Sequence, residues 1–229
     1  MHIKLILMEP KYQVNLGYIA RTAMNFGVGK LYLINPRARP DGKQARMYAK
    51  HAYRLLEGAK ICKTLDEASR DCDLLLGTTG IRQKAKASFR RIYFAEDAVA
   101  RIRKMKSNAT VGLLMGRDDT GLRGEEIEKC DMLAYIGTSP EYPVMNISHA
   151  IAVFLYLLRR GELRTHNEEG MREKKPDARE VRKLLSLFES MISRKSMRNR
   201  KAVLGAFRRM VRKSQPTEPE LHALITALK

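Results

Sequence analysis

The chain of 229 residues predicts an α/β fold, in which helices cover a parallel sheet, followed by a small all-helical domain. Over roughly residues 1–160, short apolar runs alternate with segments of helical spacing, which is typical of a parallel α/β sandwich. The opening strand, helix and strand imply a right-handed crossover between parallel strands. After residue 163 the sequence becomes polar and then helical in pattern.

The first elements follow from local patterns. Residues 3–8 form a short apolar run, and residues 15–26 place apolar side chains on one helical face before Gly27. Later segments alternate in the same way and give five or six strands in total. We predict strands at residues 30–34, 60–63, 73–76, 110–115 and 132–136, helices at 42–58, 65–71, 94–105 and 124–129, and an irregular basic segment at 81–91.

Residues 132–158 combine a strand, a polar loop and a helix start. The loop contains Gly137 and two prolines, which oppose regular structure, and Asn146 is a good cap for about three turns of apolar helix. Helix starts that follow strands are common ligand sites, because free N–H groups point outward there. The alternative is an ordinary connection at the edge of the core.

The carboxyl-terminal third divides into two parts. Residues 164–177 are polar and predict a linker between a first domain, residues 1–163, and a second, residues 178–229. The second domain contains three helical patterns. Its last helix begins with Thr217 as N-cap and Glu220 three residues later, as in a capping box.

Charge and cysteine content narrow the function. The formal net charge of +19 favours polyanionic partners, nucleic acid first and anionic membrane second. No apolar run reaches about 18 residues, so we expect no membrane attachment. The odd set Cys62, Cys72 and Cys130 lacks C-x-x-C spacing, which predicts reduced, buried thiols in a cytoplasmic protein.

Three loops after late strands are rich in glycine and small hydroxyl residues. They span residues 77–80, 116–122 and 137–146, and in a parallel sheet they open on the same edge. Such residues let backbone groups reach a purine or a ribose, although each loop alone could be a simple turn. The chain has neither G-x-G-x-x-G in its first loop nor a phosphate-binding G-x-x-x-x-G-K-[ST] loop.

Arg21 is unusual because it lies near the start of an otherwise apolar helix, where the helix dipole favours anions. It therefore needs a partner, and an RNA phosphate would accept its hydrogen bonds bidentately. An intramolecular salt bridge is the alternative.

Three ordered motifs resemble those of the SpoU branch of the SPOUT RNA methyltransferases. They are NLGYIAR at residues 15–21 with Gly27, LMGRDDTGL at residues 114–122, and YPVMN at residues 142–146 before an apolar helix. The phrases EP, LYLINP and SPEY, which begin at residues 9, 31 and 139, are most similar to TrmJ-type enzymes. Those enzymes methylate a ribose 2′-hydroxyl in the anticodon loop of tRNA.

The resemblance implies a trefoil knot built from residues 111–160 and a homodimer whose contact includes the helix at residues 147–158. It also implies that S-adenosyl-L-methionine binds in the three loops. The implied cofactor-binding residues are Thr78, Thr79, Gly80, Met115, Gly116, Ile136, Pro143, Val144, Met145 and Asn146.

The resemblance places Arg21, Asn15, Arg117 and Asn146 in the catalytic site. Arg21 would act on the target 2′-hydroxyl or its adjacent phosphate, and Arg117 and Asn146 would organise the site. No metal is required. A ribose hydroxyl is a poor nucleophile, so the protein must supply a base or electrostatic assistance together with in-line positioning.

Two positions depart from the family. Asp118 stands where glutamate is common, and Val144 stands where related enzymes often carry serine. Ser148 is a possible replacement for that serine, with helix capping as an equal alternative. His149 lies on an apolar helix, which favours a buried structural histidine over a catalytic base.

The second domain carries much of the positive charge. Residues 171–213 hold 15 Lys/Arg and 4 Asp/Glu, a net of +11, which predicts contacts to RNA phosphates rather than base reading. A solvated helical surface is the alternative. The predicted RNA-binding residues are Arg194, Lys195, Arg198, Arg200, Lys201, Arg208 and Arg209.

The sequence thus predicts an S-adenosyl-L-methionine-dependent 2′-O-ribose methyltransferase acting on tRNA. The same reaction on ribosomal RNA remains open. So does a non-catalytic RNA-binding protein that uses the same basic surface without binding the donor.

Overall fold

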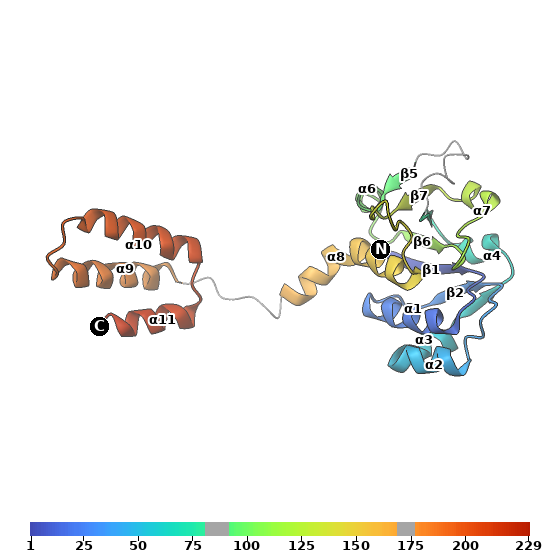
Figure 1. The fold of residues 1–229 in the computed structure, drawn as a ribbon, viewed down its shortest axis with the longest axis horizontal. Coiled ribbons are helices and arrows are strands. Elements are labelled where there is room, and N and C mark those ends of the chain that lie inside the picture. Colours follow the sequence, from blue (N-terminus) through green and yellow to red (C-terminus); the bar gives the residue numbers. More distant parts are fainter. Residues whose placement is uncertain (81–91, 169–176) are drawn as a thin grey trace. The chain divides into compact units, whose positions relative to one another are not determined.

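The computed structural model describes residues 1–80, 92–168 and 177–229, and the predicted basic segment at 81–91 lies outside them. The chain forms two compact units, Met1–Leu163 and Arg164–Lys229. The first unit contains the sheet and the second contains the basic helices (Figure 1).

The first unit is built on a seven-stranded sheet in the order β3-β2-β1-β6-β4-β7-β5. Every strand pair is parallel, as predicted. The strands are β1 (His2–Met8), β2 (Leu31–Ile34), β3 (Lys60–Cys62), β4 (Leu74–Thr78), β5 (Ile92–Phe94), β6 (Thr110–Met115) and β7 (Met132–Tyr135).

Helices cover both faces of this sheet, as Figure 1 shows. One apolar cluster joins the sheet to α1, α2, α3, α6 and α8, and a second joins its other face to α4 and α7. The bounds are α1 (Gln13–Asn25), α2 (Lys43–Ala49), η1 (Lys50–Ala52), α3 (Tyr53–Glu57), α4 (Leu65–Ser69), α6 (Ala95–Ile102), α7 (Gly124–Glu128) and α8 (Ile147–Glu168).

The prediction of five or six strands was one short, because it missed β5. Strand β5 pairs with β7 through Ile92, Tyr93 and Phe94 at the edge of the sheet. Its three residues are all at least partly exposed, so the strand has neither the length nor the alternation that reveals a strand in sequence. The trefoil knot stays a prediction, because strand order does not define how the chain is threaded.

Helix α8 corrects two expectations, one on the linker and one on His149. It continues to Glu168, so the first residues of the predicted linker at 164–177 are helical, since no proline or capping glycine interrupts them. The apolar part of this helix at 147–158 is not buried all round in the single chain, because Tyr156 is 49% exposed. His149 is also exposed, so it is not a core histidine.

The second unit consists of α9 (Ala178–Ser193), α10 (Arg200–Ser214) and α11 (Glu218–Ala227). Leu184, Val211 and Leu221 form the centre of its core, and the Phe188 and Phe207 rings stack with centroids 3.7 Å apart. The capping box of Thr217 and Glu220 is present as predicted. The basic residues therefore stand on a small helical scaffold with its own core.

Candidate active site

The three predicted loops meet at one edge of the sheet. They follow β4, β6 and β7, which are neighbours in the strand order, and parallel strands bring their carboxyl ends to the same edge. A pocket opens there, with about 960 Å³ of empty space including its mouth. We call it the donor pocket.

Nine of the ten predicted cofactor-binding residues line the donor pocket. They are Thr78, Thr79, Gly80, Met115, Gly116, Ile136, Pro143, Val144 and Met145. Asn146 lies instead in an adjoining second pocket. Sequence reasoning missed the contribution of α8, whose Ile147, Ala150 and Phe154 complete the lining. Their spacing of three and four residues was a usable signal, since it places them on one helical face.

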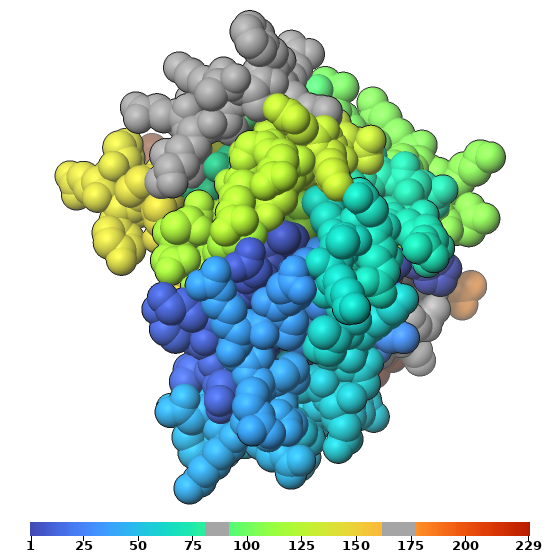
Figure 2. All heavy atoms as spheres, turned by 90° about the vertical axis from the view of Figure 1, so that its right-hand side faces the viewer, coloured from blue at the N-terminus to red at the C-terminus, as the bar shows by residue number. Residues whose placement is uncertain are grey.

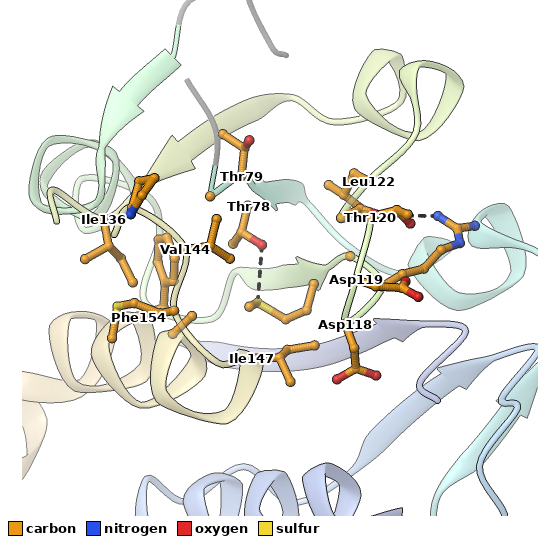
Figure 3. A pocket seen from close by; sticks show the side chains of 18 of the residues that line it. Thr78, Thr79, Asp118, Asp119, Thr120, Leu122, Ile136, Val144, Ile147 and Phe154 are labelled. Carbon is orange, nitrogen blue, oxygen red and sulfur yellow. Dashed lines mark hydrogen bonds between the residues drawn. The ribbon is translucent and has the colours of Figure 1, made fainter. Parts of the chain in front are cut away.

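The donor pocket has an apolar side and an acidic side. Figure 3 shows Ile136, Val144 and Phe154 on one side, with Asp118 and Asp119 on the opposite side. Such a pocket matches a ligand that carries both a flat apolar ring and positive charge. Val144 is 45% exposed and provides an apolar wall where related enzymes often carry a hydroxyl.

Hydrogen bonds fix the loops that shape the pocket. The buried Thr78 hydroxyl donates to the Leu114 carbonyl at 3.1 Å and so joins β4 to β6. The Thr138 hydroxyl donates to the Pro143 carbonyl at 2.8 Å and closes the third loop. These bonds favour a preformed pocket.

The loop after β6 is a tight turn in which Arg117 and Gly121 exchange backbone hydrogen bonds of 3.1 Å. A Cβ at Gly116 would overlap the backbone of Gly121 and Leu122, so only glycine fits there. Gly121 has φ of +70°, a conformation that glycine adopts at little cost. The turn therefore requires glycine at position 116 and favours it at position 121.

Arg117 forms a buried ion cluster with two carboxylates. Its guanidinium donates to Glu9 (2.9 and 2.5 Å), to Glu126 (3.0 and 2.8 Å) and to the Gly121 carbonyl (3.3 Å). An arginine has five N–H donors, and all five are used here. The hydrogen bonds from Arg117, and then those from Arg37, lower the pKa of Glu9 from 4.5 to about 2. Arg117 thus holds the loop and has no donor left for a substrate.

Asn15, Asp118 and Asn146 join the three motifs in one hydrogen-bonded chain. The Asn15 Nδ2 donates to Asp118 Oδ1 at 2.5 Å, and its Oδ1 accepts from Asn146 Nδ2 at 3.1 Å. The backbone N–H of Lys11 donates to the second Asp118 oxygen at 2.9 Å. Figure 2 shows the segment after β6 (yellow-green) directly beside the N-terminal segment (dark blue).

Asn146 also caps α8, as the sequence indicated. Its Oδ1 accepts from the Ser148 N–H at 2.9 Å and from the Ser148 hydroxyl at 2.8 Å. Ser148 is buried and bound to the cap, which supports the capping alternative for this residue over a catalytic one.

Arg21 is exposed on α1 and lines neither pocket of its own chain. It makes no ion pair within the described residues, so the structure gives no support to the salt-bridge alternative. The other three predicted catalytic residues lie together in the two pockets.

The seven predicted RNA-binding residues are all exposed on the second unit. They lie between the end of α9 and the last turns of α10. Arg200 differs from the others, because it donates to the carbonyls of Ser193 and Lys195 at 3.1 and 3.2 Å and so closes the end of α9. Arg208 lies 3.8 Å from Glu189, both on exposed surface.

One group of possible metal ligands occurs in the described part of the chain. Glu180, Glu218 and His222 place ligand atoms within 4.8 Å of one another in the second unit. The His222 Nε2 is 2.5 Å from Glu180, a contact that links α9 and α11. The expectation that no metal is needed stays a prediction. None of the described helices has the length and apolarity to cross a bilayer.

The fold and the pocket define a class: a parallel α/β protein with its ligand site where three loops meet at the carboxyl edge. The chain belongs to the SpoU rRNA Methylase family, which matches residues 2–156. The resemblance seen in the motifs is thereby confirmed.

The chain is similar to named relatives over most of its length. The tRNA (cytidine-2′-O-)-methyltransferase TrmJ of Methanocaldococcus jannaschii is 36% identical over 231 residues, which is 99% of this chain and 98% of the relative. The tRNA (cytidine/uridine-2′-O-)-methyltransferase TrmJ of Escherichia coli K12 is 32% identical and covers 72% of this chain and 65% of its own. The crystal structure of TrmJ from Z. mobilis ZM4 has a TM-score of 0.75 at 22% identity, covering 100% of this chain and 98% of that one, which shows the shared fold.

Proposed function

We propose that the protein transfers a methyl group from S-adenosyl-L-methionine to a ribose 2′-hydroxyl in the anticodon loop of tRNA. The similarity to a tRNA (cytidine-2′-O-)-methyltransferase over 99% of the chain carries this proposal. The donor pocket at the edge of β6, β4 and β7 supports it. We expect the protein to act in the cytoplasm.

The residues of the donor pocket fit S-adenosyl-L-methionine. Met115, Ile136 and Phe154 offer an apolar surface for the adenine ring, and Asp119 favours the positive sulfonium and ammonium groups. When bound, the donor supplies a methyl group that is already activated by its sulfonium charge. The Lys11 Nζ donates to Asp119 at 3.2 Å and lowers the pKa of that carboxyl.

Catalysis then depends on how the protein presents the hydroxyl. The chain of Asn15, Asp118 and Asn146 holds the entrance of the donor pocket in one geometry, which favours in-line attack. Within the described residues Arg21 makes no ion pair, so its guanidinium can donate to the target hydroxyl or its phosphate. Because Arg21 lies outside both pockets of its own chain, we propose that it acts at the site of a partner subunit.

A homodimer would bring Arg21 to such a site. The exposed side of α8 supports this arrangement, since Tyr156 is 49% exposed and Val153 is only partly buried on an otherwise apolar helix. Sedimentation at micromolar concentration should show a dimer, and Tyr156→Glu should shift it toward monomer. A wild-type monomer under these conditions would contradict the shared site.

The second unit is proposed to bind tRNA through phosphate contacts. The side chains of five basic residues are exposed and make no ion pair or hydrogen bond within the described residues: Arg194, Lys195, Arg198, Lys201 and Arg209. Such side chains gain most by neutralising phosphates and releasing counterions. Their role is affinity, while the first unit selects the nucleotide.

The deciding experiment is methyl transfer from labelled S-adenosyl-L-methionine to unmodified bulk tRNA, followed by nucleoside analysis. A 2′-O-methylated nucleoside mapped to the anticodon loop is the expected result. If only ribosomal RNA is methylated, ribosomal RNA is the substrate instead of tRNA. RNA binding without donor binding would favour the non-catalytic alternative and overturn the proposal.

A further inference from the structure

The second pocket adjoins the donor pocket and shares a wall with it. Asp118 and Ile147 line both pockets. In Figure 3 the Asp118 carboxylate points away from the centre of the donor pocket. The second pocket is lined by Lys11, Tyr12, Gln13, Val14, Asn15, Gln44, Asp118, Asn146 and Ile147. A group bound here lies next to any donor in the first pocket.

An aromatic ring, four carboxamides and a lysine line the second pocket, and the Lys11 Nζ lies 5.3 Å from the centroid of the Tyr12 ring. Tyr12 is 47% exposed and stands at the start of α1, and Gln13, Asn15, Gln44 and Asn146 are all amides. Its one carboxylate, Asp118, already accepts two hydrogen bonds, one at each oxygen. Single RNA bases are bound in this manner, by stacking on an aromatic ring and by hydrogen bonds to their edges.

Gln13 is held in one orientation. Its Oε1 accepts from the Gln44 backbone N–H at 3.2 Å, which directs its Nε2 donors elsewhere. An added Cβ at Gly42 would overlap the Gln13 carboxamide, so the side chain lies directly on the Gly42 backbone. Nε2 has no hydrogen-bond acceptor among the residues that the structure describes. A fixed amide with free donors selects for an acceptor.

We propose that the second pocket binds the base of the nucleotide to be methylated. Tyr12 stacks on this base, and Gln13 donates to the O2 carbonyl of a pyrimidine. O2 lies beside the glycosidic bond in cytosine and uracil alike, whereas guanine presents an N2 donor there. The ribose of the same nucleotide then faces the shared wall at Asp118. This inference rests on the proposed function and adds the recognition of the base to it.

Gln13→Glu is the most informative variant. Glutamate keeps an oxygen for the Gln44 N–H but replaces the free donor by an acceptor, so it should repel O2. We expect kcat/KM for a tRNA with cytidine or uridine at the mapped position to fall about 10- to 100-fold. Donor affinity should stay unchanged, because Gln13 does not line the donor pocket.

Two further comparisons separate recognition from structure. Tyr12→Ala should lower kcat/KM about 10-fold or more through lost stacking, while Tyr12→Phe keeps the ring and should stay close to wild type. Gly42→Ala should reproduce part of the Gln13→Glu effect by displacing the carboxamide. Its backbone, at φ of −67°, accepts alanine without strain.

The outcomes distinguish the two proposals. No transfer by the wild type to any RNA would overturn the proposed function and this inference with it. Transfer by the wild type that Gln13→Glu and Tyr12→Ala leave at full kcat/KM would overturn this inference alone. So would equal methylation of tRNAs carrying guanosine at the mapped position.

Discussion

The loop that follows β6 and the exposed side of α1 each carry one arginine of the predicted catalytic set, and the surroundings of these two arginines are opposite. Arg117 is 9% exposed and spends its five donors on Glu9, Glu126 and a carbonyl. Arg21 is exposed and has no ion pair within the described residues. A saturated arginine can position a loop, whereas only a free one can contact a substrate.

The largest effect should come from breaking the buried cluster. Arg117→Met removes the guanidinium between Glu9 and Glu126, whose side chains are 15% and 10% exposed. Within the described residues Glu9 then keeps only Arg37 as a hydrogen-bonded ion-pair partner. We expect the free energy of unfolding to fall by about 3–5 kcal/mol, measured by chemical denaturation. The control is Arg39→Met, which breaks a solvent-exposed pair with Asp41 and should therefore lower the free energy of unfolding far less. Equal losses would refute the positioning role.

Arg21→Ala should have the converse result. Methyl transfer should drop by about 10²–10³-fold, as for loss of a single transition-state donor, with stability and donor affinity nearly unchanged. Arg21→Lys should recover only part of the rate, because an ammonium cannot bind a phosphate bidentately. Donor affinity is measured by calorimetry. If Arg21→Ala no longer binds the donor, Arg21 belongs in the donor pocket instead.

The pH dependence of stability tests the same cluster. Since the pKa of Glu9 falls from 4.5 to about 2 on folding, its contribution is complete above about pH 4.5 and is lost as the pH falls toward 2. The denaturation midpoint of the wild type should therefore decline as the pH is lowered from 6 to 3. In Glu9→Gln the midpoint should decline less steeply with falling pH. If the midpoint of Glu9→Gln depends on pH as steeply as that of the wild type, Glu9 is not the source of the pH dependence.

The smallest effects are expected on the second unit. Alanine at Arg194, Arg198 or Lys201 should each reduce the slope of log K for tRNA against log salt by about 0.7–0.9. Arg200→Ala should instead lower stability, because this side chain donates to two carbonyls at the end of α9. Filter binding at several salt concentrations gives the slopes. If none of these variants changes the salt slope, this surface does not bind RNA.

Most of the fold could be read from the sequence because its signals are local. The alternation of strand and helix patterns, the cap at Asn146 and the capping box at Thr217 each depend on residues a few positions apart. The three loops of the donor pocket were also predictable, since parallel strands place their carboxyl ends together. The edge strand β5 was not, because three half-exposed residues carry no period.

The sequence by itself thus determined the parallel α/β class, the helical second unit, the family and nine of the residues that line the donor pocket. Only the tertiary structure decided that Arg117 is held by carboxylates, because Glu9 lies 108 positions before Arg117 and no local pattern pairs them. It also decided that Gln13 rests on Gly42 beside Asp118, at the wall of a second pocket. Contacts between segments that are distant in the chain form only when the fold packs them together. Local sequence patterns therefore do not predict them.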